Sequence, residues 1–118
     1  LIERKSKKEE HKGVMNTQLK KGVLELCILY QLRDKDLYGY EIMKAIKDQF
    51  SDVYDGSIYA ILRRLNAEGF TRKYKKDSPS GPARKYYCIT QTGIDYLNTM
   101  IVDWQKMVEG VRKLGIPF

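Results

Sequence analysis

The chain contains few of the residues that serve covalent cross-linking or metal binding. Its 118 residues include only two cysteines and one histidine. Cys27 and Cys88 fall in segments that we predict to be a helix and a strand, so they do not make a disulfide framework, and a reduced, cytoplasmic setting is expected. With His11 as the single histidine, no metal site is predicted. We expect no cofactor.

Other absences exclude further classes of protein. The sequence has no glycine-rich loop of the phosphate-binding type and no nucleophile paired with a base, so we do not expect an enzyme. No run of residues is long and apolar enough to span a bilayer, and the first residues do not form a secretory signal. A membrane is therefore not an expected partner.

Proline is also scarce, and positive charge is in excess. Two of the three prolines lie in "SPSGPARKYY", residues 78–87. Lys and Arg outnumber Asp and Glu by 22 to 15, and residues 71–87 alone carry a net charge of +5. A local excess of this kind indicates a polyanionic partner, usually nucleic acid. An anionic membrane surface and an ordinary solvated basic loop are the alternatives.

The length predicts one domain, small enough to gain stability from oligomerisation. Residues 1–14 are rich in Lys and Glu and begin with Leu rather than Met. We expect them to be a disordered or added charged leader, with Met15 as the natural start. Residues 15–90 then form the main domain, and residues 91–118 form a C-terminal helix.

Three helices are predicted at residues 17–33, 38–50 and 56–69. The third has apolar residues at i, i+3, i+4 and i+7, namely Ile58, Ile61, Leu62 and Leu65. Gly69 marks its end. Ala60, Arg63 and Ala67 lie opposite this apolar stripe, with Tyr59 and Arg64 on the flanks. The pattern fits a helix face that approaches a surface closely, and it fits an ordinary solvated face equally well.

Two strands follow, at residues 70–76 and 83–90, around a turn at residues 77–82. Strand periodicity puts Tyr87 and Ile89 on one face and Tyr86 and Cys88 on the other, and we expect the first pair to face inward. Thr90 is a suitable N-cap for the helix that follows, at residues 91–114.

This last helix has a heptad pattern of apolar residues, which are Ile94, Leu97, Ile101, Trp104, Val108 and Val111. A helix of this length extends for roughly 35 Å at 1.5 Å per residue. A domain of this size cannot cover the whole apolar seam. The pattern therefore predicts that a second copy of the chain covers it. The protein is expected to be a homodimer.

The order of the elements predicts a mainly α fold with a small β-hairpin. Three helices, a hairpin and a terminal helix correspond to a winged helix-turn-helix followed by a long C-terminal dimerisation helix. In such a unit the second helix of the pair lies in the major groove of double-stranded DNA, and the hairpin, or wing, reaches along the phosphate backbone. The prolines of the turn keep the wing tip short and stiff.

Three segments, "LYGYEI", "GSIYAILRRLNAEGF" and "GPARKYYCITQTGIDYL", closely resemble the PadR-type transcriptional regulators. The resemblance extends from about Met15 to Leu114. Two positions differ from the family pattern: the family often opens the recognition helix with Ser-Pro and has another Pro after its Tyr, whereas this chain has Tyr54-Asp55 and Ala60.

The resemblance implies a homodimeric repressor that binds an inverted-repeat operator and responds to a small aromatic or hydrophobic effector. It assigns DNA contacts to Ser57, Tyr59 and Arg63 in the recognition helix and to Lys75, Arg84 and Lys85 in the wing. Arg64 and Lys76 are further candidates. Tyr38 is a candidate phosphate contact, although a packing role is at least as consistent with its position.

Trp104, the only tryptophan, suggests where an effector binds. It lies on the predicted seam among Met100, Ile101, Met107 and Val108, where two Trp104 rings of a dimer would flank a flat ligand and the methionines would adapt to its shape. Alternatively, the indole only packs in the dimer core. Two other functions stay open: a winged-helix module that binds proteins, and a ligand-binding dimer without an operator.

Overall fold

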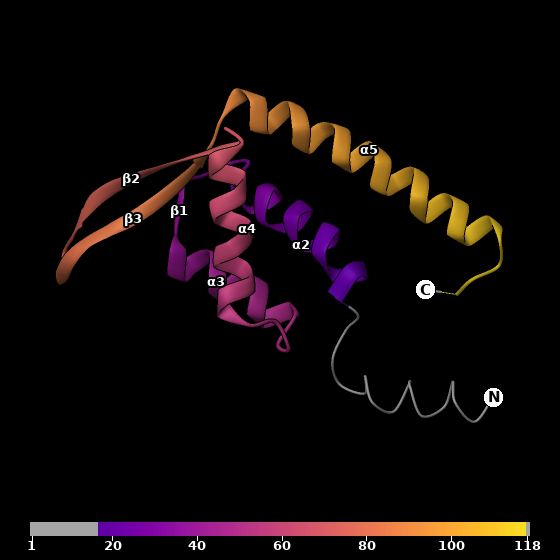
Figure 1. The fold of residues 1–118 in the computed structure, drawn as a ribbon, viewed down its shortest axis with the longest axis horizontal. Coiled ribbons are helices and arrows are strands. Elements are labelled where there is room, and N and C mark those ends of the chain that lie inside the picture. Colours follow the sequence, from indigo (N-terminus) through magenta and orange to yellow (C-terminus); the bar gives the residue numbers. More distant parts are fainter. Residues whose placement is uncertain (1–16, 118) are drawn as a thin grey trace.

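A computed structural model describes residues 17–117, with side chains from Lys20 onward. The predictions for residues 1–14 and for Met15 lie outside these residues. The elements in chain order are α2 (Thr17–Gln31), β1 (Leu37–Tyr38), α3 (Gly39–Gln49), α4 (Asp55–Ala67), β2 (Thr71–Ser78), β3 (Gly81–Ile89) and α5 (Gln91–Lys113) (Figure 1). The mainly α winged-helix prediction is confirmed, and the helices begin and end within two residues of the predicted limits.

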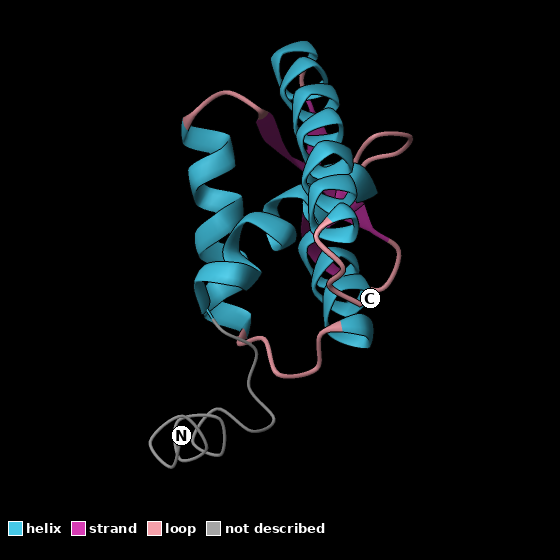
Figure 2. Ribbon diagram, turned by 90° about the vertical axis from the view of Figure 1, so that its right-hand side faces the viewer, coloured by secondary structure: helices cyan, strands magenta, loops and turns pink. Residues whose placement is uncertain are grey.

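The body of the molecule consists of α2, α3 and α4, and two elements extend from it. The β2–β3 hairpin projects to one side and α5 to the other (Figure 1). The structure is accordingly elongated, with extents of 56 × 29 × 22 Å. Figure 2 shows the molecule from the side on which α5 ends, with the strands behind the helices.

The core is formed by the apolar faces of these helices. All four residues of the predicted α4 stripe are buried, as are Leu24, Ile28, Leu29 and Leu32 of α2 and Ile42, Met43 and Ile46 of α3. Burying side chains of this size is the main favourable contribution to folding, at roughly 1.5–3 kcal/mol each. None of the helices within residues 17–117 is long and apolar enough to cross a membrane.

The sheet has three strands, whereas the sequence predicted a two-stranded hairpin. The strand order is β1-β3-β2, and β1 pairs antiparallel with β3 through Leu37 opposite Tyr87 and Tyr38 opposite Tyr86. A strand of two residues has no alternation to detect, and Tyr38 is also the N-cap of α3. The additional strand therefore fixes the wing to the start of α3.

The hairpin is also longer than predicted. Ser78 pairs with Gly81, so only two residues form the turn, and an irregularity in the pairing falls between Lys76 and Ser78. Pro82 is tolerated at the beginning of β3, where the missing N–H does not interrupt a long ladder. The predicted turn at residues 77–82 is thus corrected to Pro79 and Ser80.

A tight corner joins α4 to β2. Gly69 ends α4 with a φ of 81°, and the N–H groups of Gly69 and Phe70 donate to the carbonyls of Asn66 and Leu65 at 3.1 and 2.9 Å. These two bonds are the Schellman arrangement, in which glycine supplies the left-handed residue. The predicted role of Gly69 is confirmed.

The N-terminus of α5 is attached to this corner. The Thr90 hydroxyl accepts from Gly93 N–H at 3.0 Å, as predicted for the N-cap, and donates to the Gly69 carbonyl at 2.6 Å. Thr90 N–H donates to the Phe70 carbonyl at 3.0 Å. The beginning of α5 and the end of α4 are therefore held together by main-chain and side-chain hydrogen bonds.

From the corner α5 runs beside α2, and this contact changes the expected seam. Leu97 is fully buried in the core of its own chain, and Ile101 packs against that core. The heptad pattern assigned both residues to a partner. Because α2 covers this part of α5, Leu97 is not available to a second chain. Exposed apolar side chains are found farther along the helix, at Val102, Trp104 and Met107.

Candidate nucleic-acid interface

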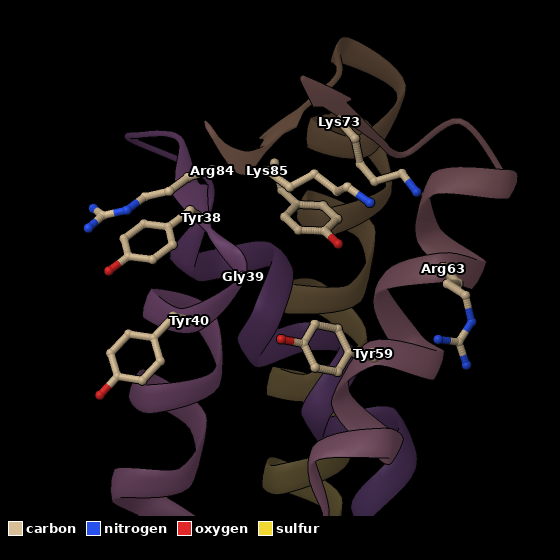
Figure 3. Close-up of a pocket in the computed structure, with 9 residues that line it drawn as sticks. Tyr38, Gly39, Tyr40, Tyr59, Arg63, Lys73, Arg84 and Lys85 are labelled. Atoms are coloured by element: carbon tan, nitrogen blue, oxygen red, sulfur yellow. The ribbon is translucent and has the colours of Figure 1, made fainter. Parts of the chain in front are cut away.

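A hollow of about 460 Å³ lies where the start of α3, the exposed face of α4 and the wing meet (Figure 3). Its lining combines hydroxyl groups and cations: Tyr38, Gly39, Tyr40, Tyr59, Arg63, Lys73, Arg84, Lys85 and Tyr87. Figure 3 shows Tyr59 reaching from α4 toward the start of α3, with Lys85 and Lys73 above it and Arg63 to one side. The mixture suits an anionic ligand that accepts hydrogen bonds.

The exposed face of α4 is the one that the helical pattern indicated. Ser57, Tyr59, Ala60, Arg63 and Ala67 are all exposed, whereas the opposite stripe is buried. No side chain caps the N-terminus of α4, where Tyr54 is the N-cap. Instead Asp55 occupies the first turn, where a negative charge is favourable, and pairs with Lys47 at 2.6 Å. Although Tyr54, Asp55 and Ala60 differ from the family pattern, α4 is still a regular helix, and its outer face is exposed to solvent.

Four exposed cations on this side of the molecule have no acidic partner among residues 17–117. Arg63, Lys73, Lys75 and Lys85 are exposed, and none of them forms an ion pair with a residue in the range 17–117. In the wing, Lys75 lies directly opposite Lys85. Like charges in this position repel each other. An anion bound between or beside the two ammonium groups reduces this repulsion. The repulsion in the free protein therefore favours the binding of an anionic partner.

The second face of the wing carries stacked tyrosines. The rings of Tyr74 and Tyr86 are 5.7 Å apart, and those of Tyr86 and Tyr38 are 5.6 Å apart. Two predicted DNA-contact residues contact these rings: Arg84 lies 4.5 Å from the Tyr38 ring centre, and Lys76 lies 5.6 Å from that of Tyr86. Such cation–π contacts restrict the positions of both side chains. Lys76 is not among the residues that line the hollow. Arg84 does line it, beside Tyr38 (Figure 3).

The outer end of the tyrosine stack is tied to the loop before β1. The Tyr74 hydroxyl donates to Asp36 at 2.5 Å. This hydrogen bond to a carboxylate raises the pKa of Tyr74 to about 12. The wing is thus held at its base by β1 and by a bond to the loop preceding it, which limits its movement relative to α3.

The position of Tyr38 is compatible with both roles considered for it. Its ring packs between Tyr86 and Arg84, and it also lines the hollow at the first turn of α3. Its backbone N–H donates to Glu41 at 3.1 Å. The positive end of the α3 dipole is directed toward this region, which favours an anion there.

Arg64 has a different environment from Arg63. Its guanidinium forms an ion pair with Glu25 of α2, a residue that is 4% exposed, and lies 3.9 Å from Glu68. The hydrogen bond to Glu25 raises the pKa of Arg64 further. A guanidinium held in this way is turned toward the core, so we remove Arg64 from the set of expected DNA contacts.

Four residues that line the hollow were missing from the sequence-based set: Gly39, Tyr40, Lys73 and Tyr87. Lys73 lies opposite Tyr87 in the sheet, two residues before Lys75. Since strand residues alternate between faces, Lys73 lies on the same face of the wing as Lys75, which the sequence-based set included. The alternation was therefore a signal that could have found Lys73. Tyr40, in the first turn of α3, carried no comparable signal. Burial raises the pKa of the Tyr87 hydroxyl above its ordinary value.

A second hollow, of about 370 Å³, is mostly apolar and lies between α2 and α5. It is lined by Gly22, Val23, Leu26, Met100, Asp103, Trp104 and Met107. Three of the five predicted effector-binding residues are among these. The other two are not: Ile101 packs against the core, and Val108 is half-buried outside the hollow.

Comparison with known proteins gives a consistent result. Residues 28–99 match the family described as "Transcriptional regulator PadR-like family". A PadR-like transcriptional regulator from Bacillus cereus is 38% identical and superimposes with a TM-score of 0.76, covering 83% of this chain and 96% of its own. A Streptococcus transcriptional regulator is 32% identical with a TM-score of 0.77, covering 84% of this chain and 98% of its own.

A protein of Lysinibacillus sphaericus is 30% identical over 99 residues, which are 81% of this chain and 91% of the relative. The family consists of transcriptional regulators and not of enzymes. The match extends from the last turn of α2 to the first part of α5 and so includes the whole cationic hollow. The chain therefore belongs to the PadR-like family and is a DNA-binding transcriptional regulator.

Proposed function

We propose that the protein is a homodimeric repressor that reads an inverted-repeat operator with α4 and holds the DNA backbone with the wing. The observation that carries this proposal is the group of four exposed, unpaired cations on one side of the molecule, Arg63, Lys73, Lys75 and Lys85. Arg63 lies on the recognition helix, so it is assigned to base edges. The three lysines of the wing are assigned to phosphates, which carry no sequence information directly.

The proposed dimer is formed by the part of α5 that its own chain leaves uncovered. Trp104 and Met107 are 41% and 58% exposed. Half-buried Val108 and Val111 lie on the same side of the helix as these two residues, since all four fall within about 100° around its axis. Contiguous apolar surface of this kind usually marks an interface. A second copy would bury these side chains, whereas Leu97 and Ile101 serve mainly the fold of the single chain. Half-buried Ile94 stays in the proposed seam.

The proposed effector site is the apolar hollow beside Trp104. Met100 and Met107 give it adaptable walls, Asp103 supplies one carboxylate, and the indole offers a flat surface for stacking. If α5 also forms the dimer interface, a ligand bound here changes the angle between the two protomers. A ligand acts in this way only by binding one arrangement more tightly than the other. A cytoplasmic location is part of the proposal, because the operator is there.

DNA binding is tested by fluorescence anisotropy on the preferred duplex, selected from a random library, and on a scrambled duplex. Lys85→Ala should weaken binding to both and reduce the slope of log K against log salt by up to about 0.9. Arg63→Ala should cost on the order of 1–3 kcal/mol on the preferred duplex and relax sequence choice.

Lys106→Ala is the matched control, because it removes one exposed positive charge from α5, away from the hollow. Its salt slope should equal that of the parent protein. The division of roles is wrong if Arg63→Ala and Lys85→Ala lose equal affinity on the two duplexes. If Lys106→Ala behaves like Lys85→Ala, binding reflects net charge alone.

A further inference from the structure

One buried carboxylate joins three helices at a distance from the DNA-binding face. Glu25 of α2 accepts a hydrogen bond from the Tyr96 hydroxyl of α5 at 2.6 Å and forms an ion pair with Arg64 of α4. Its side chain is 6% exposed. Burying a charge is costly unless it is paired and hydrogen-bonded. Each of the two carboxylate oxygens has its own donor, one on the recognition helix and one on α5.

A second attachment between the same two helices lies at the corner. Phe70, which follows the end of α4, stacks on Tyr96 with ring centres 4.2 Å apart and planes 2° from parallel. Its carbonyl accepts from Thr90 N–H at 3.0 Å. The corner fixes one point of α4 relative to α5. Arg64, more than one turn of α4 before the corner, supplies another point through Glu25, and two points define the direction of a helix.

We infer that Glu25 is a positioning residue for operator recognition, because it fixes the angle at which α4 stands relative to α5. The inference rests on the proposed function, in which α5 forms the dimer. In such a dimer the angle of α4 determines the separation of the two recognition helices. That separation must match one helical turn of DNA, about 34 Å. Glu25 therefore acts on the spacing of the two half-sites without contacting DNA.

The two ends of the network can be removed separately. Glu25→Gln keeps an oxygen that accepts from Tyr96 but loses the charge that holds Arg64. Arg64 then has Glu68 as its remaining partner. Arg64 lies in α4 and Glu68 is the C-cap of the same helix, so this pair does not connect α4 to α2. Arg64→Met keeps the apolar stem and removes the guanidinium. Combining the two changes leaves no unpaired charge in the buried network, because Glu68 is exposed to solvent. The double variant therefore separates the loss of helix position from the loss of stability that an unpaired buried charge would cause.

Asp48→Asn is the matched control. It removes the exposed ion pair between Lys44 and Asp48, which are 3.3 Å apart within α3. Exposed pairs of this kind contribute little.

The experiment measures binding of each folded variant to three duplexes. One is the inverted repeat that the parent protein selects from a random library, and the other two have the spacer between half-sites lengthened or shortened by two base pairs. Spacer discrimination is the ratio of the affinity for the selected repeat to the affinity for a repeat with an altered spacer. In Glu25→Gln, Arg64→Met and the double variant this ratio should fall by a factor on the order of ten, the size expected for one coupled charged network. Binding to a scrambled duplex should change little, and Asp48→Asn should match the parent.

Two results would overturn the inference. If the double variant is folded and keeps the spacer discrimination of the parent, the network only stabilises the fold. If Arg64→Met weakens binding to all duplexes with a shallower salt slope while Glu25→Gln does not, Arg64 contacts a phosphate. Failure of the proposed function is a separate outcome, since the parent protein would then select no inverted repeat at all.

Discussion

Gly93 offers a sharp test of the corner between α4 and α5. A Cβ atom at this position would lie 2.1 Å from the carbonyl oxygen of Phe70 and 2.8 Å from a side-chain carbon of Ile89. The nearer atom belongs to the backbone and cannot rotate away. Contacts between nonbonded heavy atoms are favourable at roughly 3.5–4.0 Å. Gly93→Ala must therefore move the start of α5 by about 1 Å away from the corner.

The cost of this movement follows from the contacts that it disturbs. The hydrogen bonds from Thr90 N–H to Phe70 and from Gly93 N–H to the Thr90 hydroxyl are both 3.0 Å long. Each contributes about 1 kcal/mol, and overpacking itself costs about 1–3 kcal/mol. Alanine returns about 1 kcal/mol through its helix propensity. We expect a net destabilisation of about 2–4 kcal/mol, which corresponds to a fall in Tm on the order of 10–20 °C.

Urea denaturation followed by circular dichroism at a fixed protein concentration measures this effect. Gly110→Ala is the matched control in the same helix, because no atom lies within 4 Å of the Cβ position there. It should stabilise the protein by about 0.5–1 kcal/mol. The reasoning is refuted if Gly93→Ala is as stable as the parent or changes stability in the same direction as Gly110→Ala.

Three further predictions concern α5. Val108→Asp should convert a dimer to monomers in sedimentation experiments, since it places an unpaired charge at the proposed seam; a parent protein that is already monomeric at micromolar concentration would contradict the dimer. Trp104→Ala should abolish binding of planar aromatic compounds, measured by calorimetry at a protein concentration at which sedimentation still shows the dimer; unchanged affinity would place the effector site elsewhere. The hydrogen bond to Glu25, followed by burial, raises the pKa of Tyr96 to about 12. The stability from this protonated hydroxyl is present below about pH 10 and is lost as pH rises through about 12, so Tyr96→Phe should show a smaller fall in urea midpoint than the parent over that range.

Elements with a strong periodic signal could be predicted from the sequence. The α4 stripe has one apolar residue at each expected position, and Gly69 and Thr90 give unambiguous ends to α4 and α5. These signals are local, since they depend on residues within one or two turns of each other. The winged-helix order followed from them.

Interactions between distant segments could not be predicted. Glu25 and Arg64 look like ordinary surface residues in sequence, and only the packing of α2 against α4 brings them together. Leu97 fitted the heptad seam, but the same spacing serves contact with α2 of its own chain. Strand β1 has two residues and exists because β3 provides a partner. In each case the deciding contact joins residues far apart in the chain.

The opposed lysines of the wing have a consequence for how salt acts on this protein. Lys75 faces Lys85, and Lys76 faces Arg84, so dissolved anions that screen these pairs make the unbound hairpin more stable. The same anions compete with phosphate for the bound state. Amide hydrogen exchange in β2 and β3 should thus slow as salt is added to the free protein, over the range in which the complex with DNA dissociates. The free wing is therefore expected to be most ordered at the salt concentrations at which the complex with DNA has already dissociated.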